Sequence, residues 1–215
     1  LLKERSNLCT IIAAPQRLLL EQWNEVVFQQ LPNLSTLMCN SDNKNWRAEL
    51  NDKLFNFSNG ISEQVLILTT YSTLSSSDFI EILRGKYDVS KDYLFIADEM
   101  HNSGAEKTSK CLLDEFNLRL GLSATPERYF DEEGTEKIFD YFGGTIFEYS
   151  LKKAIEDGKL TPYDYIPLVV YLTSEEYTKY IKITKQIINT SHRDDVDVKD
   201  RLERLMMRRA EITKK

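Results

Sequence analysis

The sequence has few of the residues that build metal centres and disulfide frameworks. Its 215 residues include three cysteines and two histidines. Cys9, Cys39 and Cys111 are widely scattered, and no two of them have C-x-x-C spacing. This pattern argues against a structural zinc site and against a disulfide framework. Scattered cysteines fit a reducing compartment best, so we expect a cytoplasmic location.

The sequence also lacks long apolar runs and an excess of basic residues. No stretch approaches the ~18 consecutive apolar residues of a membrane-spanning helix, and the N-terminus has no signal-peptide layout. We therefore expect no membrane partner. With 28 Lys and Arg against 34 Asp and Glu, the formal net charge is −6. A general basic coat for nucleic acid is excluded, so any such contact must come from local groups.

Continuous apolar runs predict buried strands, because strands covered on both faces need no polar side. Helical spacing of apolar residues lies between these runs. Strands that alternate with helices predict an α/β fold with a parallel sheet and flanking helices. The strands are expected at 8–15, 64–71, 93–99 and 118–126, with a weaker one at 34–39, and the helices at 16–31, 45–57, 72–85 and, less clearly, 106–116.

The C-terminal part has a different pattern. At this length we expect one domain with an appendage, divided here into 1–150 and 151–215. Ser150 and Gly158 are suited to cap a short helix. A strand is expected within 161–173, and Thr173 with Glu176 predicts a capping box that opens a helix over 174–189. A last helix follows 201, so the extension is mainly helical.

Each predicted strand ends in polar or small residues. In an open parallel sheet the carboxyl ends of the strands share one edge, where ligands bind. These residues are therefore expected to form one site. They are Ala14-Pro15, Thr69-Thr70-Tyr71, Asp98-Glu99 and Ser123-Ala124-Thr125-Pro126.

Two adjacent carboxylates at the tip of a buried strand suit a nucleotide–magnesium site. Asp98 is the candidate for holding Mg²⁺, often through a water, and Glu99 the candidate for orienting and deprotonating the attacking water. Phosphoryl transfer asks the protein mainly for positioning and charge compensation. The alternative is that both acids only end the strand and face solvent, but His101 and the Ser-Ala-Thr of the next strand favour a site.

Other chemistries fit less well. A glycosidase pair needs carboxyls that face each other across ~5–10 Å, whereas neighbours on a strand point to opposite faces. A serine nucleophile elbow reads G-x-S-x-G, whereas residues 121–125 read GLSAT. A zincin needs H-E-x-x-H on a helix, and DEMH at 98–101 has neither that spacing nor a second histidine.

Four segments in order resemble the motifs of superfamily 2 helicases and translocases. DEMH (98–101) resembles their DExH box, GLSATPER (121–128) motif III, IIAAPQRLLLEQW (11–23) motif Ia and ILTTYSTL (67–74) motif Ib. Residues 141–180 are similar to the segment after motif III in one branch. That branch holds the helicase subunits of type III and type I restriction enzymes and related repair helicases.

The resemblance implies a RecA-like, P-loop NTPase type motor domain that uses ATP and Mg²⁺ to move on nucleic acid. The nucleic acid that we expect is double-stranded DNA. By position, Asp98 would be the magnesium carboxylate and Glu99 the catalytic base. His101 would couple the ATP site to the motif Ser123, Ala124 and Thr125. The residues implied to touch the sugar-phosphate backbone are Pro15, Gln16, Arg17, Thr70 and Tyr71. Restriction or repair subunits would be further partners.

The sequence departs from the family pattern in one respect. It contains no G-x-x-x-x-G-K-[ST], the loop that holds the β- and γ-phosphates. We expect this loop just upstream of Leu1, and a second RecA-like domain beyond Lys215. The RecA-like fold would then be incomplete at its N-terminus, and the chain alone inactive. The alternative function is a non-catalytic RecA-like module that binds protein or nucleic acid.

Overall fold

The computed structural model describes residues 5–128, 131–191 and 198–214. The chain divides into two compact units, Leu1–Glu148 and Tyr149–Lys215, and each is described by itself. No helix within the described ranges is long and apolar enough to cross a membrane.

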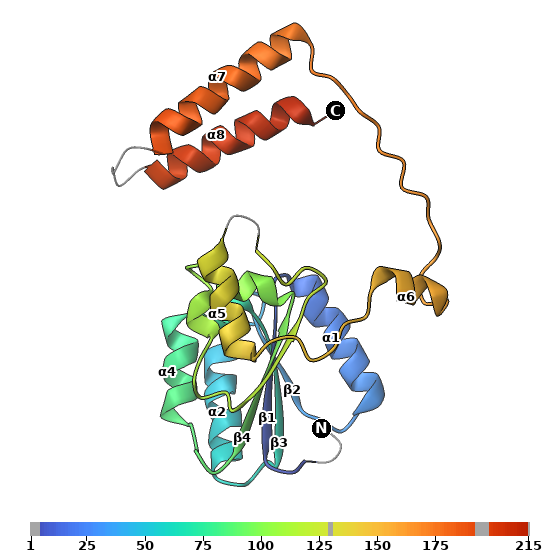
Figure 1. Ribbon diagram of the computed structural model, residues 1–215. Helices are drawn as coiled ribbons and strands as arrows, with labels where there is room; N and C mark the ends of the chain where they lie inside the picture. Colours follow the sequence, from blue (N-terminus) through green and yellow to red (C-terminus); the bar gives the residue numbers. More distant parts are fainter. Residues whose placement is uncertain (1–4, 129–130, 192–197, 215) are drawn as a thin grey trace. The chain divides into compact units, whose positions relative to one another are not determined.

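The first unit is built on a five-stranded parallel sheet in the order β2-β3-β1-β4-β5 (Figure 1). The predicted α/β class is confirmed, and the weak strand near 34–39 is the edge strand β2. Every connection between sheet neighbours is a crossover, as a parallel sheet requires. The strands are β1 (Leu8–Ala14), β2 (Thr36–Cys39), β3 (Gln64–Thr70), β4 (Asp92–Asp98) and β5 (Leu118–Leu122).

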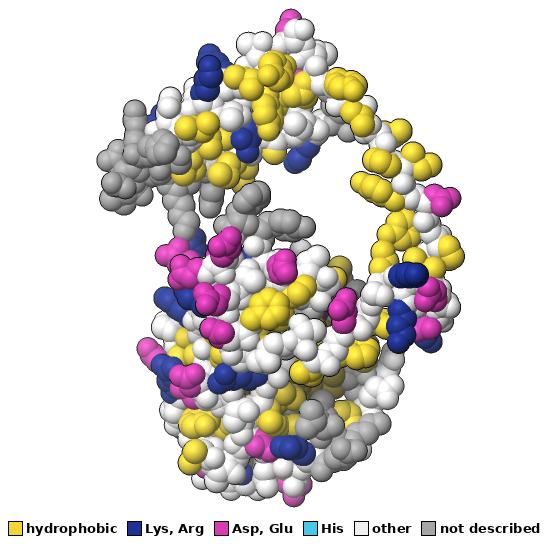
Figure 2. All heavy atoms as spheres, in the orientation of Figure 1, with side chains coloured by type: hydrophobic (Ala, Val, Ile, Leu, Met, Phe, Trp, Pro, Cys, Tyr) yellow, Lys and Arg dark blue, Asp and Glu magenta, His cyan; other side chains and the backbone are white. Residues whose placement is uncertain are grey.

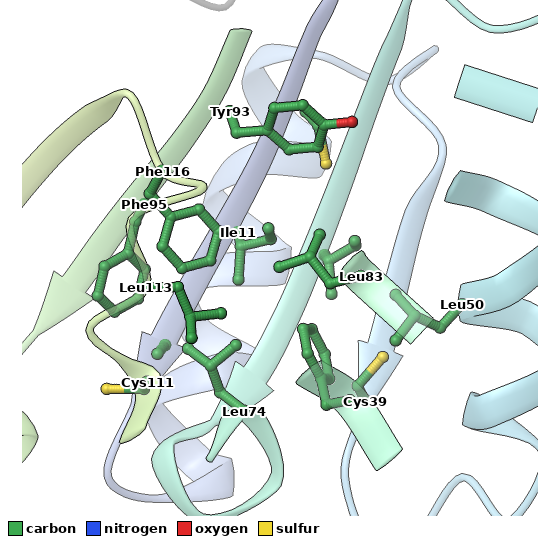
Figure 3. Close-up of a cluster of buried hydrophobic side chains, with 14 of the residues drawn as sticks. Ile11, Cys39, Leu50, Leu74, Leu83, Tyr93, Phe95, Cys111, Leu113 and Phe116 are labelled. Carbon is green, nitrogen blue, oxygen red and sulfur yellow. The ribbon is translucent and has the colours of Figure 1, made fainter. Parts of the chain in front are cut away.

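Alternation along the strands divides the core into two layers, because successive side chains point to opposite faces. On β1, Ile11 faces the larger layer, under helices α2 (Trp46–Ser58), α4 (Ser77–Gly85) and α5 (Glu132–Phe142). Ile12 faces the smaller layer, under helix α1 (Arg17–Gln30). Figure 1 shows α1 on one side of the sheet and α2, α4 and α5 on the other, and Figure 3 shows the aromatic and aliphatic packing of the larger layer.

Two predicted helices differ from those in the structure. The predicted helix at 72–85 is two helices, α3 (Tyr71–Leu74) and α4. The prediction of a helix at 106–116 was wrong, since only the 3₁₀ turn η2 (Ser109–Cys111) forms there, shortly after another 3₁₀ turn, η1 (Met100–Gly104). The hydroxyls of Thr108 and Ser109 donate to the carbonyls of Ala105 and Glu106. Such local bonds compete with a helix.

Helix α5 was not predicted, although its ends carry sequence signals. Asp131 accepts a hydrogen bond from the Gly134 amide at 2.9 Å and so caps the N-terminus. Glu132 and Glu133 follow in the first turn, where acids are favourable. Gly143 ends the helix in a left-handed conformation with φ 81°, which glycine adopts without strain.

The second unit contains helices α6 (Leu151–Glu156), α7 (Ser174–Ser191) and α8 (Val198–Thr213). The predicted cap at Ser150 is confirmed by a bond of 3.3 Å from the Lys153 amide. The predicted capping box is also confirmed: the Thr173 amide donates to Glu176 at 2.7 Å, and the Glu176 amide donates to Thr173 at 3.3 Å.

The prediction of a strand within 161–173 was wrong. These residues have no regular secondary structure, and their apolar side chains are exposed, Tyr165 to 82% and Leu168 to 85%. Figure 2 shows apolar side chains along this segment between α6 and α7. A strand needs a neighbouring backbone to pair with, and the described part of this unit contains only helices beside it.

Candidate nucleotide site at the carboxyl edge of the sheet

The polar strand ends meet at one edge of the sheet, as the sequence predicts. The last residue of β1, Ala14, is paired with Thr70 of β3. One step back, Ala13 is paired with Ala97 of β4, and Asp98 at the end of β4 is paired with Leu122 of β5. The residues that follow these strands therefore leave the sheet at the same level.

Asp98 lies on the α1 side of the sheet and is half-buried. Its Oδ2 accepts a hydrogen bond of 2.9 Å from the indole nitrogen of Trp23 in α1. Its backbone carbonyl accepts a bond of 2.8 Å from the Tyr71 hydroxyl. Both bonds come from other elements: the first orients the carboxylate, and the second holds the backbone of the strand tip. The carboxylate is therefore not a free solvated group.

Glu99 has an unusual backbone. Its φ of 52° and ψ of 55° are left-handed, a conformation that costs a residue with a side chain roughly 1–2 kcal/mol. The turn breaks β4 and starts η1, so that Glu99 does not continue the alternation of the strand. Strained residues of this kind cluster at functional sites. The strain turns the second carboxylate toward His101, with Oε2 at 3.4 Å from Nδ1.

His101 joins the two neighbouring strand ends. Its Nδ1 lies 3.1 Å from Oγ of Ser123, which follows β5. Its Nε2 lies 3.1 Å from the side-chain nitrogen Nδ2 of Asn102, which is a donor. In the neutral imidazole Nε2 is then the acceptor and Nδ1–H donates. Ser123 Oγ also accepts from the Thr125 amide at 3.2 Å. His101 therefore contacts Ser123 directly, whereas Thr125 and Ala124 are exposed.

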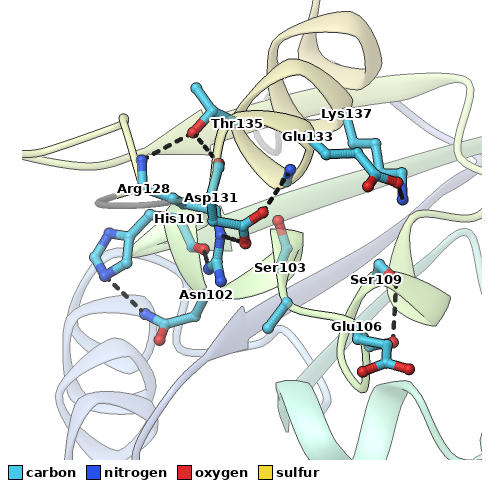
Figure 4. A network of polar contacts seen from close by, with 12 residues as sticks. His101, Asn102, Ser103, Glu106, Ser109, Arg128, Asp131, Glu133, Thr135 and Lys137 are labelled. Atoms are coloured by element: carbon cyan, nitrogen blue, oxygen red, sulfur yellow. Dashed lines mark hydrogen bonds and ion pairs between the residues drawn. The ribbon is translucent and has the colours of Figure 1, made fainter. Parts of the chain in front are cut away.

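Arg128 links the turn η1, which contains His101, to the N-terminus of helix α5, as Figure 4 shows. Its guanidinium donates to the backbone carbonyl of His101 and, at 2.7 Å, to the Asp131 carboxylate that caps α5. Its own amide donates to Thr135 at 3.0 Å. The bond from Arg128, joined by the amide of Gly134, holds the pKa of the Asp131 carboxyl below its usual value. Sequence reasoning did not single out Arg128, although it belongs to the quoted GLSATPER.

The residues implied to contact nucleic acid all lie at the same edge, but one of them is buried. Gln16 and Arg17 are exposed at the start of α1, beside half-buried Pro15, and Arg17 forms an ion pair with Asp42. Thr70 caps α3, accepting from the Thr73 amide. These positions are open to a ligand.

The prediction for Tyr71 needs correction. Its side chain is only 3% exposed, and its hydroxyl is bonded to the Asp98 carbonyl. Burial raises the pKa of this hydroxyl well above its usual value. Tyr71 therefore ties the end of β3 to the end of β4, and its side chain is not available to a nucleic-acid strand.

The donor set fits magnesium only together with a ligand that brings its own oxygens. Among the described residues, no group of three His, Cys, Asp or Glu side chains can hold a metal. Mg²⁺ commonly uses one or two carboxylates plus phosphate oxygens and waters. Asp98 supplies such a carboxylate at the sheet edge, and Glu99 supplies a second close by.

Comparison with known proteins decides the family. The family described as "Type III restriction enzyme, res subunit" matches residues 1–128. The chain belongs to this res-subunit family. The predicted relationship to superfamily 2 helicases of the restriction-enzyme branch is thereby confirmed. The matched range includes the four motifs and ends at Arg128.

The chain is also similar to two individual proteins. It is 40% identical over 74 residues to the Type I restriction enzyme EcoAI endonuclease subunit of Escherichia coli. This aligned stretch covers 33% of this chain and 9% of that protein. The chain resembles the Hef helicase domain of Pyrococcus furiosus with a TM-score of 0.50 at 16% identity, covering 86% of this chain and 38% of that one. The chain thus spans a small part of both relatives, and the second supports the fold.

Proposed function

We propose that this chain is part of the first motor domain of an ATP-dependent DNA helicase or translocase that acts in restriction or repair. One observation carries the proposal. Nδ1 of His101 lies 3.4 Å from the Glu99 carboxylate and 3.1 Å from Ser123. One imidazole therefore touches both the candidate base and the motif on the neighbouring strand.

The proposed chemistry assigns one task to each group. Asp98 would hold Mg²⁺ through a water, and the bound metal would compensate the charge of the triphosphate. Glu99 would accept the proton of the attacking water. His101 contacts both Glu99 and Ser123, so a change at Glu99 would alter the position of Ser123. Thr125 would move with Ser123, because its amide donates to the Ser123 hydroxyl. Gln16, Arg17 and Thr70 would hold the phosphate backbone without reading its sequence.

Replacing the proposed base tests this assignment. In the full-length protein, Glu99→Gln keeps the size of the side chain but removes its proton acceptor. We expect ATP turnover to fall by roughly 10²–10⁴-fold, while ATP binding is retained. The control is Glu106→Gln, an exposed acid a few residues further on, which should leave turnover unchanged. Unchanged turnover in Glu99→Gln would assign the base to another residue.

We also propose that these 215 residues alone hydrolyse no ATP, because the sequence has no loop of the form G-x-x-x-x-G-K-[ST] to hold the phosphates. The measurement is phosphate release by the isolated chain with Mg²⁺ and duplex DNA. Robust DNA-stimulated hydrolysis would refute the proposal. The alternative of a non-catalytic module would require the full-length protein to lack hydrolysis as well.

A further inference from the structure

The Asp98 carboxylate is held by a residue to which the proposed chemistry gives no task. Trp23 and Asp98 are 75 positions apart, yet the indole N–H donates to Oδ2 at 2.9 Å. Trp23 lies in the second turn of α1, and its ring packs on the apolar layer beneath that helix. Its orientation is therefore set by packing, and the hydrogen bond transmits this orientation to the carboxylate.

The indole is suited to orient a metal-binding carboxylate. It is a donor only and carries no charge, so it occupies one oxygen without neutralising the anion. A lysine or arginine at this place would compete with a cation for the same charge. With Oδ2 taken by Trp23, Oδ1 remains for a water of a hydrated metal ion. Hydrogen-bond partners of metal-binding carboxylates typically change metal affinity or activity 10–100-fold when removed.

We propose that Trp23 is a positioning residue that presents Oδ1 of Asp98 to magnesium–triphosphate. This inference rests on the proposed function, because it needs Asp98 to be the metal carboxylate. A purely structural role is the competing explanation, since a buried indole N–H usually finds some acceptor. The two explanations differ in what the loss of the N–H does to metal binding in a protein that is still folded.

The first test asks whether the hydrogen bond exists in solution. Trp23 and Trp46 are the two tryptophans of the sequence, so two indole N–H resonances are expected in a ¹⁵N spectrum of this chain. Trp46→Phe assigns them. In Asp98→Ala, the Trp23 indole proton should exchange with solvent at least about tenfold faster, because it loses a charged acceptor. An exchange rate equal to that of the wild type would overturn the proposal.

The second test measures metal binding without turnover. In the full-length protein with ATP, Mn²⁺ serves as the probe and is followed by electron paramagnetic resonance. Trp23→Phe keeps an aromatic ring but has no N–H, and should weaken Mn²⁺ binding about 10–100-fold. The matched control is Trp46→Phe, which changes a tryptophan of α2 in the other core layer and should leave the Mn²⁺ affinity unchanged. Equal affinity in Trp23→Phe and wild type would overturn the proposal.

The outcomes separate this proposal from the proposed function. If Asp98→Ala binds Mn²⁺–ATP as tightly as wild type, Asp98 is not the metal carboxylate and both fail. If Asp98→Ala loses the metal and folded Trp23→Phe does not, only the role of Trp23 fails. Should Trp23→Phe not fold, the wild type still decides: bound Mn²⁺–ATP should broaden the Trp23 indole resonance far more than that of Trp46, and equal broadening would overturn the proposal.

Discussion

Gly104 is the point where helix α5 touches the turn that carries His101. A β-carbon built on Gly104 would lie 2.6 Å from Cδ1 of Ile138, 2.7 Å from the Gly134 carbonyl oxygen and 2.8 Å from Cδ of Arg128. The two side-chain atoms can move, but the carbonyl can move only with α5. We therefore predict that Gly104→Ala pushes α5 away from η1 and pulls Arg128 from the His101 carbonyl.

The magnitude follows from the cost of overpacking a core, typically about 1–3 kcal/mol. Because a backbone atom is among the clashing partners, we expect the upper half of this range. For a chain of this size, each kcal/mol lowers the melting temperature by roughly 2–4 °C. Urea unfolding of the chain, followed by circular dichroism, measures the loss directly.

The matched control for this substitution is Gly85→Ala. Gly85 is the last residue of α4, and a β-carbon there meets no atom within 4 Å. Alanine should leave stability unchanged or raise it by up to about 1 kcal/mol, because it restricts the unfolded chain. If Gly104→Ala proves as stable as Gly85→Ala, the close packing of α5 on the His101 turn is refuted.

Two further predictions concern single residues of the site. Glu99→Gly should raise the free energy of unfolding by up to ~1 kcal/mol, since glycine removes the left-handed strain but costs some chain entropy. Among the described residues, Asn7 is the other non-glycine residue with a positive φ, 64°. In urea unfolding, Asn7→Gly should gain less stability, because Asn tolerates this conformation. A loss of stability above ~1 kcal/mol in Glu99→Gly would contradict the strain. The hydrogen bond from Arg128 lowers the pKa of Asp131 in the folded protein. This bond therefore contributes to stability above the unfolded-state pKa of about 3.9. The contribution is lost as the pH falls through the lower pKa of the folded state. Asp131→Asn should therefore flatten the fall in the urea midpoint between roughly pH 5 and pH 2, and a fall as steep as in the wild type would count against this bond.

The sheet could be predicted because its information is local. β4 consists mainly of apolar residues and ends at Asp98, with Glu99 directly after it. Both the strand and the place of these two acids at the sheet edge follow from that apolar run. The meeting of His101 and Ser123 follows in turn from parallel neighbours, because β4 and β5 pair and end at one level. The place of residues that lie just after a strand can thus be predicted from the sequence.

Other features depend on contacts that the sequence does not reveal. The helical pattern at 106–116 does not form a helix, because the hydroxyls of Thr108 and Ser109 bond to nearby backbone carbonyls instead. The apolar run at 161–173 reads as a strand, but pairing needs a partner that pattern alone does not supply. Tyr71 and Trp23 both direct their polar atoms to Asp98 from other elements, and neither distance can be read from spacing along the chain.

The proposed function depends most on one feature, namely that the ends of β4 and β5 form one site for magnesium–triphosphate. The direct measurement is a structure of the full-length protein with Mg²⁺ and a non-hydrolysable ATP analogue. We predict a hydrated Mg²⁺ about 4 Å from the Asp98 carboxylate, one water away given Mg–O bonds of about 2.1 Å, with Glu99 facing the γ-phosphate. A nucleotide bound away from Asp98 and Glu99, with Mg²⁺ held by other residues, would contradict the account.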